Sequence, residues 1–187
     1  MPCADGSSMV TEFIYWSDYY NSIISPFYSY STGRTKETLR SSQVTCRDID
    51  DDGYIEIPED TSSKKQSSEI TSQNWVNYGN TVLSHKCYSF SCKRDGYILV
   101  IDDDDFSKVK ANYDSESRKL TIINKKNKSN VFEIVTLINS NYSVNDPKYK
   151  DYTMIMKNSG FVYLAKVNKS SDIDINIQTL KDMIKVY

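Results

Sequence analysis

Asp48–Glu59 reads DIDDDGYIEIPE and carries the most specific chemical pattern in the chain. Asp48, Asp50 and Asp52 alternate with other residues, and Gly53 follows them directly. Ca²⁺ takes about six to eight oxygen ligands in a flexible shell, and closely spaced carboxylates on a tight turn can supply them. A glycine after the third carboxylate permits the positive φ angle that such a turn needs. The stretch therefore predicts a calcium loop.

This sequence pattern fits two architectures, the helix–loop–helix of an EF-hand and a loop between two strands. Tyr54 and Glu56 stand at positions 7 and 9 of the loop and Glu59 at position 12, so the full EF-hand pattern is matched. An EF-hand needs an amphipathic helix on each side of the loop. The upstream segment KETLRSSQVTCR favours a strand, however, and the downstream segment EDTSSKKQSS has no apolar residue to bury. Ile55 and Ile57 alternate as in a strand, which predicts an ion at the bend between two strands and excludes Glu59 as a ligand.

The rest of the chain reads as two parts around a polar linker. Residues 10–58 contain short runs of β-branched and aromatic residues, which predict a small antiparallel β unit of about the length of a propeller blade. Residues 59–69 have no apolar side chain until Ile70 and read as a linker or exposed loop. Residues 1–9 have neither a basic nor an apolar region, so we expect an added or truncated start to a longer chain.

Residues 70–187 predict an antiparallel sheet with a packed C-terminal helix. Strand-like segments alternate with turn signals, of which residues 158–160 (NSG) are the clearest. Pro147 suits the first position of a short helical turn. A single apolar stripe predicts the C-terminal helix, with Ser171 or Asp172 as its cap. Its members are Ile173, Ile177, Leu180, Ile184 and Tyr187. The predicted class is α+β and β-rich, with the small β unit preceding this domain.

Composition and missing signatures exclude several functions. The chain has 23 basic and 25 acidic residues, so no surface for nucleic acid is predicted. It has no run of about 18 apolar residues that could span a membrane. His85 is the only histidine, and neither it nor the Cys87–Cys92 pair belongs to a catalytic or zinc signature, so no enzymatic activity is expected. The acidic run Asp102–Asp105 lacks a glycine and is interpreted as a solvated strand end rather than a second cation site.

RDIDDDGYIEIP, residues 47–58, resembles the calcium loop of FG-GAP or VCBS-type repeats, the integrin-like propeller repeats. With the polar linker, the Trp75 strand and DGYILVI further on, the chain resembles the carboxyl-terminal part of uncharacterised secreted lipoproteins of Firmicutes. The resemblance spans most of the chain, although only the loop motif is specific. It implies an exported, extracellular or cell-surface protein anchored as a lipoprotein. It also implies Ca²⁺ ligands at the side chains of Asp48, Asp50, Asp52 and Glu56 and at the carbonyl of Tyr54.

Two positions depart from the family pattern. Asp51 stands where these loops commonly have Gly or Asn, so a left-handed turn there has a cost. Glu56 replaces an aspartate and places its carboxylate one carbon further out. The alternative to a metal site is a turn whose carboxylates cap backbone amides. Four close carboxylates repel one another without a cation, which favours the metal.

These observations predict a non-enzymatic domain of an exported cell-envelope protein, with Ca²⁺ as a structural staple. The partner is expected to be a protein or a glycan. The alternative is carbohydrate or peptide recognition by a Tyr- and Trp-rich β surface, with WSDYYN (residues 16–21) as its platform. Aromatic residues also fill β-sheet cores. Exposure of Trp16, Tyr19 and Tyr20 together therefore distinguishes recognition from packing.

Overall fold

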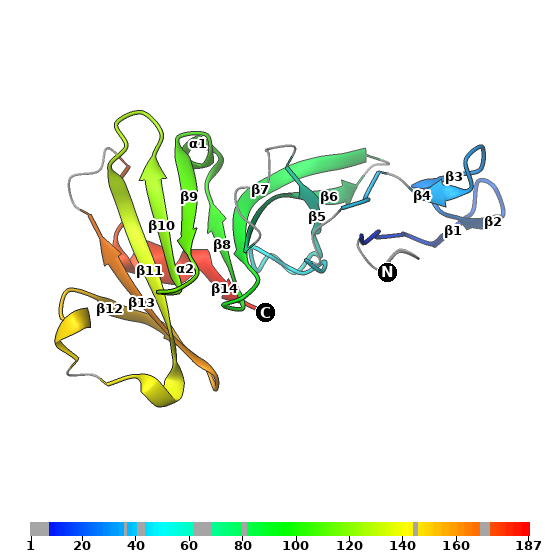
Figure 1. Ribbon diagram of the computed structural model, residues 1–187. Helices are drawn as coiled ribbons and strands as arrows, with labels where there is room; N and C mark the ends of the chain where they lie inside the picture. The colour runs from blue at the N-terminus through cyan, green and yellow to red at the C-terminus, as the bar shows by residue number, and fades with distance from the viewer. Residues whose placement is uncertain are drawn as a thin grey trace. The chain divides into compact units, whose positions relative to one another are not determined.

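The structure is a computed structural model of the chain, and it describes residues 8–35, 37–40, 44–61, 69–79, 82–143, 146–168 and 173–187 (Figure 1). It contains two compact units, residues 1–62 with 73–87 and residues 63–72 with 88–187. Residues 73–87 thus group with the first unit, although the polar linker predicts that the second domain begins at residue 70. Residues 62–68 of the expected linker and residues 1–7 of the expected start lie outside the described residues.

Every strand pair that the structure describes is antiparallel. The strands of the first part of the chain are β1 (Tyr15–Ser17), β2 (Ser22–Ile24), β3 (Tyr28–Ser29), β4 (Arg34–Thr35), β5 (Ile57–Asp60), β6 (Ile70–Gly79) and β7 (Val82–Cys92). β1 pairs with β2, β3 pairs with β4, and β5 pairs with β6 from Ile57 opposite Val76 to Asp60 opposite Gln73. The first unit has a small core of Phe27, Ile57 and Val76, against which Phe13 and Tyr78 pack.

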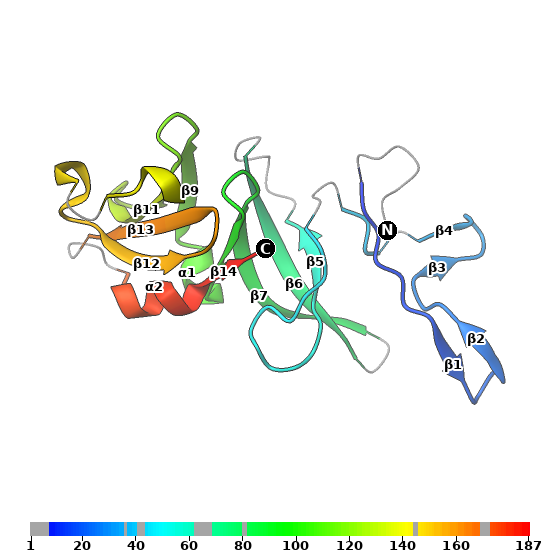
Figure 2. The same ribbon diagram turned by 90° about the horizontal axis from the view of Figure 1, so that it is seen from below.

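The second part contains β8 (Tyr97–Ile101), α1 (Asp103–Phe106), β9 (Val109–Asp114), β10 (Lys119–Asn124), β11 (Asn130–Ile138), η1 (Asn139–Asn141), η2 (Pro147–Tyr149), β12 (Thr153–Lys157), β13 (Phe161–Val167), α2 (Ile177–Met183) and β14 (Ile184–Val186). Five of its strands form one sheet in the order β12-β13-β11-β10-β9, and β8 pairs with the end of β7 and with β14. Figure 2 shows α2 alongside β12, and α2 also contacts β8, β13 and β14. The predicted β-rich α+β class is confirmed.

The core of the second unit follows from the strand pattern. Alternate or consecutive apolar residues of β8, β10, β11 and β13 are fully buried, among them Leu99, Leu120, Phe132 and Tyr163. The expected turn at residues 158–160 joins β12 to β13, where Asn158 Oδ1 accepts the N–H groups of Gly160 and Phe161 at 2.9 and 2.7 Å. The predicted turn at Pro147 is the single 3₁₀ turn η2.

The C-terminal helix is shorter than its apolar stripe predicts. Asn176 caps α2, with its side-chain oxygen accepting the N–H groups of Gln178 and Thr179. Ile173 therefore precedes the helix. Ile184 lies in β14, where it pairs with Leu99 of β8 and is buried. The free edge of β8 offers backbone hydrogen bonds that a further helical turn could not use, and a β-branched residue suits such a pairing. The expected caps at Ser171 and Asp172 lie outside the described residues.

One carboxylate lies in the interior of the second unit. Asp95, in the turn between β7 and β8, is fully buried. Its Oδ1 accepts from Arg118 Nε and Nη2 at 2.7 and 2.6 Å, and its Oδ2 accepts from the Tyr113 hydroxyl at 2.8 Å and the Cys92 thiol at 3.5 Å. Burial is the largest cause that raises the pKa of Cys92, to about 12, so this thiol stays protonated. The Asp95 network is thus closed by the protein's own donors.

Candidate metal centre

The predicted loop is closed by an antiparallel bridge. Arg47 and Glu56 exchange both backbone hydrogen bonds, at 3.2 and 2.8 Å, and β5 begins directly after Glu56. No helix flanks the loop within described residues 44–61, so the helix–loop–helix alternative is excluded there. Asp51 has φ 62° and Gly53 has φ 90°, as the tight turn requires. Aspartate tolerates the left-handed region better than most residues do.

Hydrogen bonds inside the loop hold its shape. Asp48 accepts the N–H of Asp52 at 3.0 Å on Oδ1 and the N–H of Gly53 at 2.8 Å on Oδ2. Asp52 Oδ1 accepts the N–H of Tyr54 at 2.9 Å. These bonds are the amide caps of the metal-free interpretation. Each carboxylate oxygen has a second lone pair, however, so the caps leave ligand capacity on Asp48.

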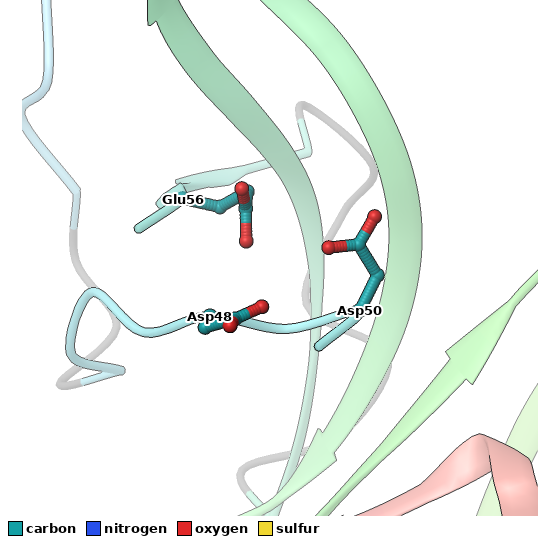
Figure 3. Close-up of side chains that lie close together, drawn as sticks. All are labelled: Asp48, Asp50 and Glu56. Carbon is teal, nitrogen blue, oxygen red and sulfur yellow. The ribbon is translucent and has the colours of Figure 1, made fainter. Parts of the chain in front are cut away.

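Three carboxylates converge on one space. Ligand oxygens of Asp48, Asp50 and Glu56 all lie within 4.8 Å of one another, and Figure 3 shows the three side chains pointing toward a common centre. Asp50 is exposed, Asp48 is half-buried and Glu56 is fully buried. The cluster is therefore open to solvent on one side and closed by the protein on the other.

Glu56 is the unusual member. Its Oε2 accepts the N–H of Ile49 at 2.9 Å, whereas its Oε1 is buried and accepts no hydrogen bond. Burial is the main reason that its pKa is raised; the Ile49 N–H opposes this, and the charges of Asp50, Asp52 and Asp48 raise the pKa further. A buried carboxylate oxygen without a donor is costly unless it meets a cation or takes up a proton.

A lysine from another strand reaches the same loop. Lys86 of β7 forms ion pairs with Asp50, at 3.0 Å, and with Asp52. Its hydrogen bond to Asp52 is the largest cause that raises the pKa of Lys86 and lowers that of Asp52. The loop motif does not reveal this contact, because Lys86 lies 34 residues beyond Asp52 in the chain.

The predicted ligands are thus only partly brought together. Asp48, Asp50 and Glu56 form the cluster, whereas Asp52 lies beside it and is held by Lys86. The Tyr54 side chain is exposed, and its backbone N–H is bonded to Asp52 rather than to the cluster. The geometry can hold a cation on three carboxylates.

The other acidic or cysteine-containing stretches offer no comparable group within the described residues. Asp102 directly follows β8 and is the N-cap residue of the short helix α1, which Asp103–Asp105 begin. His85 is exposed and its Nδ1 is hydrogen-bonded to Asn74 Oδ1. Cys87 and Cys92 are not joined to each other by a disulfide.

Among the residues described, no helix is long and apolar enough to cross a membrane. No family model, curated protein or solved structure matches the chain. The support for a metal centre is therefore the geometry of Asp48, Asp50 and Glu56.

Proposed function

We propose that the chain is a non-enzymatic binding or scaffold module of an exported cell-envelope protein, in which Ca²⁺ staples the loop of the first unit. Asp48, Asp50 and Glu56 are the carboxylate ligands at the core of the site. Asp52 and the carbonyl of Tyr54 complete the shell after a small movement of the loop. The proposed role of the site is structural, because the ion would join Asp48 and Asp50 to Glu56, at the bridge that closes the loop.

The buried Glu56 oxygen is the observation that carries the proposal. Glu56 Oε1 has no hydrogen-bond donor among the described residues, and the like-charged carboxylates of Asp48 and Asp50 lie close to the Glu56 carboxylate. A divalent cation at their common centre removes this repulsion and supplies the missing partner at once. Carboxylate and carbonyl oxygens are hard ligands, which favour Ca²⁺ over softer metals such as zinc.

Isothermal titration calorimetry tests the staple. We expect Ca²⁺ to bind with a dissociation constant of about 0.1–1 mM, the range of extracellular calcium modules, and to raise the unfolding temperature. Asp50→Ala and Glu56→Gln each remove one ligand and should abolish both effects. Asp104→Ala, in the acidic run of α1, is the matched control and should change neither. Absence of heat and of thermal stabilisation at 10 mM Ca²⁺, a concentration above this range, would reject the staple.

A second candidate function is recognition by the hairpin of β1 and β2. Trp16, Tyr19 and Tyr20 are exposed by 57%, 89% and 66%, so these side chains do not fill a core. The Tyr19 and Tyr20 rings lie edge to face with centroids 4.8 Å apart, and Trp16 Nε1 donates to Asp18 at 3.1 Å. Exposed aromatic faces with polar edges are suited to stacking on sugars or to binding peptides.

A glycan array and a peptide array test the hairpin surface. We expect ligands found on either array to lose binding in Trp16→Ala and Tyr19→Ala. Tyr142→Ala, a change in the second unit, should leave that binding intact. Ligands that bind the wild type and both hairpin variants equally well would assign recognition to another surface.

A further inference from the structure

A pocket of about 590 Å³ opens in the first unit beside the metal loop. All of its lining residues belong to that unit. Three of them, Asp52, Tyr54 and Ile55, are part of the loop, and Asn77 and Tyr78 come from β6. The volume lies within the range of small-molecule sites, about 300–1,000 Å³. The loop that holds the cation cluster therefore also forms one wall of a pocket.

Two aromatic side chains also line the pocket. Phe13 and Tyr78 both line the pocket, with ring centroids 5.2 Å apart. Phe27 packs behind them, at 5.6 Å from Phe13 and 5.0 Å from Tyr78. On the loop side, Tyr54 and Ile55 are exposed by 70% and 59%. A ligand in the pocket therefore meets aromatic and aliphatic side chains both from β6 and the segment before β1 and from the loop.

Two side-chain polar atoms of pocket-lining residues lack a hydrogen-bond partner among the residues described, the Asn77 side-chain oxygen and the Tyr78 hydroxyl. The side-chain oxygen of Asn77 is buried and accepts no hydrogen bond from any described residue. A buried acceptor without a donor costs about 1–3 kcal/mol. A rotation of the Asn77 side chain toward the pocket would let a ligand hydroxyl or N–H recover this cost. Ser84 also lines the pocket, and its hydroxyl donates to the backbone oxygen of Asn77 at 3.5 Å. The pocket therefore selects a ligand that has both an apolar face and a hydrogen-bond donor.

We propose that this pocket binds a neutral saccharide ring, and that binding depends on Ca²⁺ in the adjacent loop. A pyranose offers a C–H face to the aromatic side chains and hydroxyl donors to Asn77. A purely apolar ligand leaves the amide oxygen unpaired, and the loop carboxylates repel an anionic ligand. The dependence on Ca²⁺ rests on the proposed staple, because an ion that fixes Asp48, Asp50 and Glu56 also fixes the neighbouring Tyr54 and Ile55.

Saturation-transfer NMR with a panel of neutral methyl glycosides, in 5 mM Ca²⁺ or in EDTA, tests the proposal. We expect at least one methyl glycoside to bind in Ca²⁺ and to bind about tenfold more weakly in EDTA. Asn77→Leu should weaken that binding about tenfold by removing the acceptor, and it should stabilise the free protein, since this buried, unpaired oxygen is removed. Calorimetric Ca²⁺ titration of Asn77→Leu confirms that its first unit is folded.

Controls separate this pocket from the other sites. Asn112→Leu, at an exposed position of β9 in the second unit, should bind the glycoside like the wild type. Trp16→Ala should do so as well, because Trp16 does not line the pocket. Normal Ca²⁺ binding without any glycoside binding rejects the pocket and leaves the staple intact. Glycoside binding that is equal in Ca²⁺ and EDTA rejects the coupling. Absence of Ca²⁺ binding to the wild type rejects the staple and, with it, the proposed dependence of glycoside binding on Ca²⁺.

Discussion

Glu56 of the first unit and Asp95 of the second are both fully buried carboxylates, and they differ in the donors that surround their oxygens. Asp95 accepts from Arg118, Tyr113 and Cys92, so each of its oxygens has a donor from the protein. Glu56 has one backbone donor, one bare oxygen and other carboxylates nearby. A buried charge that is neutralised by the chain's own donors needs no ion from the solution. A buried charge without such donors makes the stability of its unit depend on the Ca²⁺ concentration and the pH of the solution.

The largest effect is expected when Asp95 loses its cationic partner Arg118. Arg118→Met leaves Asp95 buried without its cation and should cost the second unit about 3–5 kcal/mol in unfolding free energy. Arg94→Met is the control, because Arg94 donates from an exposed position to the Ser115 carbonyl and should matter by less than about 0.5 kcal/mol. Urea unfolding followed by amide hydrogen exchange in β9–β11 measures both. Equal effects of the two changes would show that Asp95 does not depend on Arg118.

Addition and removal of Ca²⁺ should change the stability of the first unit, which contains Glu56, and leave that of the second unit unchanged. With 5 mM Ca²⁺ we expect the unfolding free energy of the first unit to rise by about 1–2 kcal/mol, and EDTA to reverse the gain. Amide exchange should slow at Ile49, Gly53 and Tyr54, whose N–H groups bond to loop carboxylates. The amides of β9–β11 should be unchanged. Equal slowing in both units, or equal slowing by Mg²⁺, would indicate a general salt effect.

The pH dependence of the first unit should have opposite signs with and without Ca²⁺. The pKa of Glu56 is raised in the folded state, so folding binds a proton between its unfolded pKa of about 4.5 and its folded pKa. In EDTA, stability should therefore fall as pH rises through that window. In Ca²⁺ the carboxylate must be ionised, so stability should rise instead. Glu56→Gln should remove the difference.

The lowered pKa of Asp52 affects stability in a separate, more acidic pH range. Its contribution is present above its unfolded pKa of 3.8 and is lost as pH falls toward its folded value. Thermal unfolding from pH 4.5 to pH 7 thus isolates Glu56. A slope in EDTA that is the same in wild type and Glu56→Gln would assign the pH dependence to another group.

The smallest effect concerns the lysine that competes for the loop. Lys86→Met removes an ammonium from Asp50 and Asp52, so Ca²⁺ affinity should increase about two- to fivefold. Lys108→Met, which removes an ion pair with Asp105 in the second unit, should leave affinity unchanged. Calorimetry at constant ionic strength measures both variants. Weaker Ca²⁺ binding in Lys86→Met would mean that the lysine positions the ligands instead of competing with the ion.

Local patterns predicted much of the fold and part of the site. Alternation and turn residues located most strands, and Gly53 marked the turn, because these signals act over a few neighbouring residues. The helix ending was missed because β14 depends on the free edge of β8, about 85 residues earlier in the chain. The contact between Lys86 and the loop was missed for the same reason. The burial of Glu56 also depends on tertiary packing. The position of Glu56 in the motif therefore could not predict that its Oε1 is buried without a hydrogen-bond donor.

The two tryptophans have an optical consequence. Trp16 and Trp75 are the only tryptophans in the chain, and both belong to the first unit. Trp75 is fully buried opposite Pro58 of β5, whereas Trp16 is 57% exposed. Indole fluorescence therefore reports on the first unit alone, and iodide should quench Trp16 and spare Trp75. We expect emission from Trp75, which lies on β6 beside β5, to give a label-free signal for cation binding in the first unit.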